Sequence, residues 1–184
     1  MRVIAGMAKR RGLITPRGLA VRPTADRIKE ALFNILGASV AGCRFLDMYA
    51  GAGTVGIEAL SRGAGQVVFI EKEADNVRII KKNLQITGLA ENARCLHMPV
   101  NKAIALLASE QVSFELIFMD PPYGEDLIPD TLKGIAGNNL LKPKGIVVAE
   151  SAKGARLPEN VTGGLQMCRR EIYSETMITF FQCK

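Results

Sequence analysis

The 184-residue sequence lacks the features that mark several classes of protein. It has no tryptophan, a single histidine, and four cysteines without any CxxC pair among them. Zinc sites and disulfide frameworks need cysteines and histidines at characteristic spacings, so the sequence predicts neither kind of site. No apolar run approaches the ~20 residues of a membrane helix, and no unbroken apolar stretch follows the N-terminus as in a secretory signal. We therefore expect a cytoplasmic protein that binds neither a metal nor a membrane.

The composition is that of a globular domain with a substantial core. Hydrophobic residues make up 48% of the chain and charged residues 23%, a balance that excludes a disordered chain, a coiled coil and a collagen. A chain of this length is of ordinary size for one domain. We expect a single domain over residues 1–184, made of an N-terminal arm (1–22), a helix (23–38) and a core (42–184).

The basic excess is confined to the start of the chain. The net charge is +6, and residues 1–30 hold eight basic and two acidic side chains, which leaves 16 of each sign in the remainder. The eight basic residues are Arg2, Lys9, Arg10, Arg11, Arg17, Arg22, Arg27 and Lys29. This pattern predicts an arm that binds a polyanion, attached to an electrically neutral body. The alternative is a solvated basic terminus that binds nothing.

Glycine and proline divide the first 22 residues into short pieces, which predicts a loose, extended or hairpin-like arm. Thr24 then has the features of an N-cap, and Asp26 would lie in the first turn of the helix that follows. Apolar residues recur at helical spacing over 25–36, and Gly37 can end this helix.

Beyond residue 43, short apolar strands alternate with amphipathic helices. The predicted strands are 44–49, 66–71, 93–97, 114–120 and 145–150, and the predicted helices are 55–62, 74–87, 102–108 and 127–135. Strands that are apolar on both faces, joined by helices, form a parallel sheet covered on both sides. Residues 165–184 hold two β-rich runs without a helix between them, which predicts an antiparallel hairpin. The fold class is therefore α/β, a doubly wound and mostly parallel sheet of seven strands.

A glycine-rich turn follows the first predicted strand. Gly51, Gly53 and Gly56 fit the pattern GxGxxG, and Glu71 ends the second strand twenty residues after Gly51. This arrangement suits a dinucleotide, whose ribose hydroxyls the acid would bind, but it also occurs as a merely tight turn. Asp47 argues against a dinucleotide, because a carboxylate at the strand end does not favour the binding of a negatively charged pyrophosphate. It suits the ammonium group of an amino-acid-like ligand such as S-adenosylmethionine, which also has a ribose.

The fourth predicted strand delivers the sequence Asp120-Pro121-Pro122-Tyr123 at its carboxyl end. In open α/β sheets, ligands bind at the carboxyl ends of the strands, so this motif and Asp47 would lie together. The exocyclic amine of a base is a poor nucleophile, because its lone pair is delocalised into the ring. Asp120 and the Pro121 carbonyl could accept its two N–H bonds from a turn stiffened by proline. Tyr123 could stack on a base that has left its own stack.

These motifs together resemble the RsmD family of class I, Rossmann-like methyltransferases. The matching segments are RVIAG at 2–6, VRPTADRIKEALFNIL at 21–36, LDMYAGAGTVGIEALSRGA at 46–64, DPPY at 120–123, LLKPKGIVVAE at 140–150 and YSETMITFF at 173–181. The resemblance covers nearly the whole chain. It implies transfer of a methyl group from S-adenosylmethionine to N2 of a guanine in small-subunit (16S) ribosomal RNA.

The resemblance and the motifs assign three sets of residues. The expected cofactor-binding residues are Asp47, Tyr49, Gly51, Gly53, Glu71 and Lys72, and the expected catalytic residues are Asp120, Pro121, Pro122 and Tyr123. The expected RNA-binding residues are Arg10, Arg11, Arg17, Arg22, Thr24 and Arg27. The partner would be ribosomal RNA, free or within the 30S subunit or an assembly intermediate, bound by a monomer. The chain departs from the family where an acid usually meets the adenine amine, since it has His97-Met98-Pro99-Val100 there. We expect His97 to be a partly buried rim residue and not a catalyst.

Three other functions are compatible with parts of the sequence. DNA adenine-N6 methyltransferases also use DPPY, although a chain this short has little room for their separate target-recognition region. A nicotinamide-dependent oxidoreductase could use the glycine turn. The chain could also be a non-catalytic RNA-binding module, which binds RNA through the basic arm and has a vestigial pocket.

Overall fold

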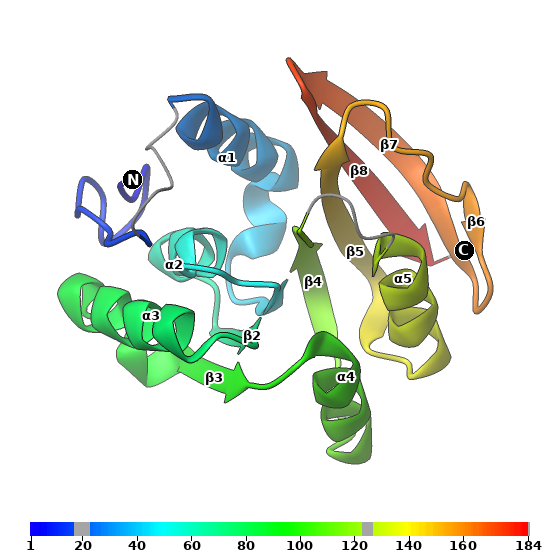
Figure 1. The fold of residues 1–184 in the computed structure, drawn as a ribbon, viewed down its shortest axis with the longest axis horizontal. Coiled ribbons are helices and arrows are strands. Elements are labelled where there is room, and N and C mark those ends of the chain that lie inside the picture. The colour runs from blue at the N-terminus through cyan, green and yellow to red at the C-terminus, as the bar shows by residue number, and fades with distance from the viewer. Residues whose placement is uncertain (17–22, 123–126, 184) are drawn as a thin grey trace.

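The computed structural model describes residues 1–16, 23–122 and 127–183. Within them one eight-stranded sheet has the order β3-β2-β1-β4-β5-β8-β7-β6 (Figure 1). Its strands are β1 (Arg44–Met48), β2 (Gln66–Glu71), β3 (Ala93–His97), β4 (Phe114–Met119), β5 (Leu141–Ala152), β6 (Asn160–Val161), β7 (Leu165–Tyr173) and β8 (Thr176–Cys183). The first five in this order are parallel, and β8, β7 and β6 continue the sheet in antiparallel fashion. The α/β class and the C-terminal hairpin are confirmed, and the two-residue β6 is an addition to the seven predicted strands.

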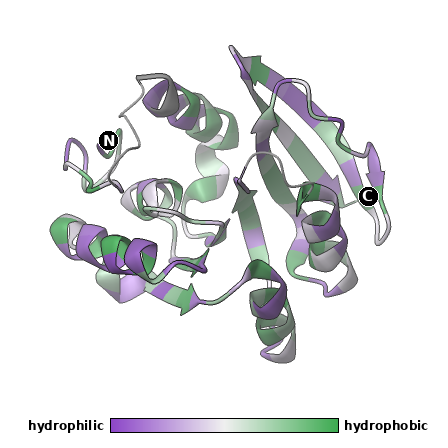
Figure 2. Ribbon diagram, viewed as in Figure 1, coloured by the Kyte–Doolittle hydropathy of each residue, from purple (hydrophilic) through white to green (hydrophobic). Residues whose placement is uncertain are grey.

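Helices cover both faces of the sheet (Figure 1). They are α1 (Pro23–Leu36), α2 (Thr54–Ser61), α3 (Ala74–Thr87), α4 (Val100–Ser109) and α5 (Leu127–Gly137), with 3-10 turns at Gly37–Val40 and Ala90–Asn92. Alternate strand residues enter two hydrophobic clusters: Val67 and Phe69 pack with α1–α3, whereas Val68 and Ile70 pack with α4 and α5. Burial on both faces explains why Val67–Ile70 is a continuous apolar run, whereas β7, near the far edge of the sheet, carries more hydrophilic residues (Figure 2). None of the described helices is long and apolar enough to cross a membrane.

The bounds of β2, β3 and α3 match the sequence prediction. Gly88 ends α3 with a φ of 73°, the left-handed conformation that glycine adopts at helix ends. The predicted N-cap at Thr24 is wrong, because α1 already begins at Pro23. Proline is favoured at the first helical position, where its missing N–H costs nothing. Thr24 therefore lies inside the first turn, and its side chain is outside the described part of the structure.

Residues 1–16 form a compact element that we call the N-terminal hairpin. Arg2 and Gly12 pair in antiparallel fashion, and three apolar side chains, Val3, Ala8 and Leu13, are buried in the cluster that contains α1–α3. The hairpin lies beside α2 and α3 (Figure 1). The expectation of a hairpin-like arm is thus met, but the expectation that it is loose is wrong for these residues.

Candidate active site at the carboxyl edge of the sheet

The glycine turn between β1 and α2 has the backbone that its sequence predicts. Gly51 and Gly53 have φ values of 55° and 74°, and the Gly53 N–H donates to the Ala50 carbonyl at 2.7 Å. A Cβ atom on Gly51 would meet nothing within 4 Å, so this side of the turn is open to a ligand. Tyr49 has a left-handed φ of 59°, and its hydroxyl is hydrogen-bonded to that of Thr131 on α5 at 2.8 Å. One hydrogen bond therefore closes the turn itself, and the other ties the residue before it to α5.

Asp47 is one of two buried carboxylates at this site, with Glu71. Its side chain is 2% exposed, and Oδ2 accepts a hydrogen bond from the Gly56 N–H at 2.8 Å. Burial is the main cause that raises the pKa of Asp47 to about 8, and the nearby Asp120 and Glu71 carboxylates add to it. Asp47 thus ties β1 to the first turn of α2, while its contact with a ligand ammonium group stays a prediction.

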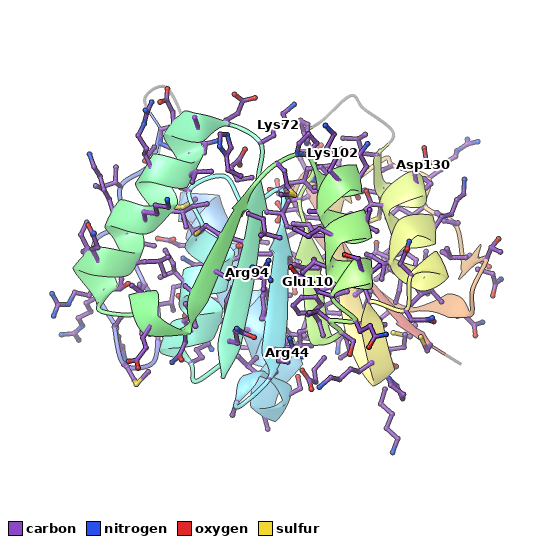
Figure 3. All side chains as sticks on the ribbon, turned by 90° about the horizontal axis from the view of Figure 1, so that it is seen from below. Arg44, Lys72, Arg94, Lys102, Glu110 and Asp130 are labelled. Atoms are coloured by element: carbon purple, nitrogen blue, oxygen red, sulfur yellow. The ribbon has the colours of Figure 1, made fainter. Side chains whose placement is uncertain are left out.

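Glu71 joins the end of β2 to the glycine turn. Its Oε2 accepts from the Gly51 N–H and its Oε1 from the Glu73 N–H, both at 2.8 Å, and its side chain is 7% exposed. Lys72 follows at the same edge of the sheet, as Figure 3 shows. The Lys72 carbonyl is hydrogen-bonded to His97 Nε2 at 3.1 Å. His97 is exposed, so the expectation of partial burial is wrong, and its ring supports the backbone beside Glu71.

Asp120 comes directly after β4, at the level of Glu150 on β5. The two residues before them, Met119 and Ala149, are paired in the sheet, and Met119 also pairs with Met48 of β1. The Asp120 side chain reaches solvent, yet the surrounding protein displaces water and raises the pKa of this carboxyl to about 6.

The predicted motif continues from Asp120 into a turn that is only partly described. Pro121 is buried and Pro122 is exposed. Tyr123 lies outside the described residues, so its stacking role stays a prediction.

Glu150 is a site residue to which the sequence analysis gave no role. It is half-buried near the end of β5. Burial first, and the Asp120 charge second, raise the pKa of Glu150 to about 8. A carboxylate at the end of a fifth apolar strand is the signal that could have found it, because the carboxyl ends of parallel strands share one edge.

The site therefore combines four carboxylates, contributed by Asp47, Glu71, Asp120 and Glu150. The Asp120 and Glu71 charges help to raise the pKa of Asp47, and the Asp120 charge helps to raise that of Glu150, so a cationic ligand or an N–H donor is stabilised there. A pyrophosphate would meet repulsion, which argues against a nicotinamide dinucleotide. No group of potential ligands among the described residues is arranged to hold a metal ion.

The predicted RNA-binding residues are only partly described. Arg10 and Arg11 are exposed on the N-terminal hairpin, and Arg27 is exposed on α1. Arg17 and Arg22 lie outside the described residues. The charged groups that are described thus face solvent while the backbone that carries them is anchored.

Glu58 provides one of these anchors and was missed by the sequence analysis. Its side chain is fully buried on α2, where it accepts hydrogen bonds from the Ile4 and Ala5 N–H groups at 2.8 and 3.0 Å. Arg62 Nε donates to it at 2.7 Å, and Lys29 Nζ lies 3.8 Å away. Burial lowers the pKa of Lys29, an effect that the Glu58 charge opposes. Glu58 is the one charged residue of α2, Thr54–Ser61, and this was the signal that could have found it.

Comparisons with known proteins agree on the kind of protein to which this site belongs. The family model described as Conserved hypothetical protein 95 matches residues 1–182. YlbH of Bacillus subtilis, provisionally named an rRNA methyltransferase, is 37% identical over 182 residues, 99% of this chain and 98% of its own length. Ribosomal RNA small subunit methyltransferase D of Haemophilus influenzae is 35% identical over 165 residues, 88% of this chain and 85% of its own. The solved structure of yhhF from Escherichia coli, provisionally described as a methyltransferase, has a TM-score of 0.86 at 32% identity, with 100% of this chain and 98% of that chain covered.

Proposed function

Because the chain belongs to the family of ribosomal RNA small subunit methyltransferase D, we propose that it transfers a methyl group from S-adenosylmethionine to the exocyclic N2 of a guanine in 16S ribosomal RNA. The observation that carries the proposal is the position of Asp120 beside Glu150 at the end of β4, next to the glycine turn and two buried carboxylates. This arrangement provides acceptors for an amine beside a site that favours a cation.

The residues of the glycine turn fit S-adenosylmethionine. Gly51 is open on one side, and Asp47 and Glu71 provide carboxylates for the ammonium group and the ribose hydroxyls. The bound cofactor would supply a methyl group activated by the positive charge of its sulfonium. Tyr49 and Lys72 border the same turn and complete the proposed cofactor-binding set.

Asp120 has the properties needed to address the target amine. Above its raised pKa of about 6, the carboxylate is ionised and can accept an N–H bond from N2. The Pro121 carbonyl would accept the second N–H, so that the nitrogen is fixed in orientation and gains electron density. Positioning of this kind lowers the barrier without a strong base. After the transfer, the Asp120 carboxylate can take up the proton that the nitrogen releases.

The N-terminal hairpin provides the proposed RNA contacts. Arg10 and Arg11 are exposed there, and Arg27 is exposed on α1, which starts seven residues after the hairpin ends. Contacts of arginine with phosphate supply affinity that does not depend on base sequence. We propose that a monomer in the cytoplasm acts on 16S RNA, either free or within the 30S subunit.

A transfer assay tests the proposal. The protein is incubated with S-adenosylmethionine labelled in its methyl group and with 16S RNA, 30S particles lacking the modification, or duplex DNA. We expect label in RNA or in 30S particles and none in DNA. Label in DNA, or no label in either RNA substrate while the protein is folded, would overturn the proposed function.

A further inference from the structure

Asn83 connects two parts of the molecule that are distant in sequence. It lies on α3 with a fully buried side chain. Its Nδ2 donates to the Ala52 carbonyl at 3.0 Å and to the Ile14 carbonyl at 2.9 Å, and its Oδ1 accepts from the Ile14 N–H at 2.8 Å. A single amide group therefore bonds the glycine turn and the N-terminal hairpin at the same time.

The bond to Ala52 controls the orientation of the glycine turn. A trans peptide is planar, so fixing the Ala52 carbonyl also fixes the N–H of Gly53 on the opposite side. That N–H makes the 2.7 Å bond to the Ala50 carbonyl that closes the turn. Asn83 accordingly holds the peptide between Ala52 and Gly53, whereas Gly51 in the same turn has open space around it.

The two bonds to Ile14 hold the end of the hairpin through its backbone. The Ile14 side chain is 42% exposed, so burial contributes little to fixing this residue. Residues earlier in the hairpin are anchored differently, since the Ala8 N–H donates to Ser61 Oγ on α2 at 3.0 Å. Ile14 therefore depends on Asn83 more than the rest of the hairpin does.

We propose that Asn83 is a positioning residue that couples the glycine turn to the N-terminal hairpin, so that cofactor binding and RNA binding strengthen each other. The inference rests on the proposed function, which places the cofactor at the turn and RNA at the hairpin. A ligand that holds the turn keeps the Asn83 amide in place, and the amide in turn holds Ile14. Ordering that one ligand has already achieved does not have to be repeated for the other. The coupling is reciprocal, so each ligand must raise the affinity of the other by the same factor.

Hydrogen exchange tests the connection without any catalytic readout. The exchange rate of the Ile14 amide is measured with and without S-adenosylhomocysteine, the product form of the cofactor. We expect at least threefold slower exchange at Ile14 in the complex and little change at Ala8, which is bonded to α2. An Ile14 amide that exchanges at the same rate in both states overturns the inference.

The second test measures the coupling itself. RNA affinity is determined by filter binding to 16S RNA, with and without saturating S-adenosylhomocysteine, for wild type, Asn83→Asp and Ser61→Ala. Asn83→Asp keeps an acceptor for the Ile14 N–H and removes both donated bonds, whereas Ser61→Ala weakens only the hairpin's attachment to α2. We expect at least about fivefold tighter RNA binding with the ligand in wild type, in the range of typical coupling factors. The factor should fall below twofold in Asn83→Asp and persist in Ser61→Ala.

The outcomes separate this inference from the proposed function. If wild type does not bind S-adenosylhomocysteine, the proposed function fails. If it binds both ligands independently, the coupling fails while the proposed function stands, and this result requires no variant to fold. If Ser61→Ala loses the coupling as fully as Asn83→Asp, the effect reflects general stability, and the role assigned to Asn83 is wrong.

Discussion

The N-terminal hairpin and the carboxyl edge of the sheet carry opposite charges and hold them in different ways. On the hairpin, Arg10 and Arg11 are exposed, while the backbone that carries them is bonded to α2 and α3. At the carboxyl edge, Asp47 and Glu71 are buried, and their carboxylates accept hydrogen bonds from backbone N–H groups. Asp47 and Glu71 are thus charged groups of the interior, whereas Arg10 and Arg11 are charged groups of the surface.

The difference shows what each charge can do. Exposed cations keep their hydration and attract a polyanion over a distance of about a Debye length, roughly 8–10 Å in physiological salt. Buried carboxylates act only on groups in contact, but they act strongly because little water screens them. The hairpin therefore suits a large substrate and the edge suits a small, cationic or N–H-donating one. Substitutions at the carboxyl edge test the binding of the small ligand and the target amine, and substitutions on the hairpin test the binding of RNA.

The largest expected effect comes from removing the carboxylate of Asp120. Asp120→Ala should lower methyl transfer to 30S particles by at least about 100-fold, since the N2 amine is deprived of its acceptor. A tenfold loss corresponds to only ~1.4 kcal/mol of barrier. The measurement is a single-turnover rate, with calorimetry of S-adenosylhomocysteine as the control that should stay within about threefold. Retention of more than a tenth of the wild-type rate would show that Asp120 is not the amine acceptor.

The pH dependence should follow the ionisation of Asp120. Burial raises its pKa to about 6, and only the ionised form accepts the amine, so the rate should fall about tenfold per pH unit below pH 6 and level off above it. Glu150 has a pKa of about 8 and is neutral at pH 6. Glu150→Gln should therefore leave the midpoint within about half a unit. A midpoint near pH 4 in wild type would contradict this assignment.

A substitution of Asp47 tests how much its buried, ionisable carboxyl lowers the free energy of unfolding. Its pKa is raised from an ordinary 3.8 to about 8, so the folded state binds the proton more tightly than the unfolded state. Stability should then fall as pH rises between about 4 and 8. Asp47→Asn keeps an acceptor for the Gly56 N–H and removes the group that must take up a proton on folding, so it should stabilise the ligand-free protein by up to about 4 kcal/mol at pH 7. Urea unfolding at pH 4 and pH 7 checks this, because the gain should vanish at pH 4.

The same substitution should weaken the binding of S-adenosylhomocysteine by about 1–3 kcal/mol, the usual range for a hydrogen bond to a charged group. A destabilised Asp47→Asn protein, or one with unchanged ligand affinity, would show that the carboxylate serves the fold and not the ligand.

The smallest effect on activity is expected from the exposed arginines of the N-terminal hairpin. Arg10→Gln with Arg11→Gln should weaken RNA binding and lower the log–log salt slope by about 0.7–0.9 for each phosphate that the variant no longer neutralises. Thermal stability should change little, because both side chains are exposed. Lys144→Gln is a matched control, since Lys144 is an exposed cation near the start of β5 and shares the left-handed backbone of Arg10. An equal loss of RNA affinity in the control would show that the hairpin arginines contribute no more to RNA binding than other exposed cations do.

The sheet and the position of the candidate site could be predicted from sequence, because both follow from local patterns. Strands that are apolar on both faces require helices on both sides, and the turn at Gly51 and the motif at Asp120 each follow such a strand. Glu150 also lies at the carboxyl end of an apolar parallel strand, but no motif surrounds it that would have marked it as part of the site.

The anchors of the hairpin could not be predicted in this way. Glu58 accepts hydrogen bonds from residues 53 and 54 positions earlier, and Asn83 bonds Ile14 across 69 positions. No local pattern encodes contacts over such separations. Glycine and proline in the first 22 residues indicated only where the backbone turns. The burial of Val3, Ala8 and Leu13, which fixes the hairpin to the body, depends on an apolar cluster that forms only when α1, α2 and α3 are folded together.

The most direct test of the central claim is the identity of the methylated nucleoside. RNA from 30S particles that were treated with labelled S-adenosylmethionine and wild-type protein is digested to nucleosides and analysed by mass spectrometry, with the Asp120→Ala protein in parallel. We expect label in N2-methylguanosine for wild type and none for the variant. Label in a methylated adenosine or cytidine, or in N2-methylguanosine at equal yield from the variant, would contradict it.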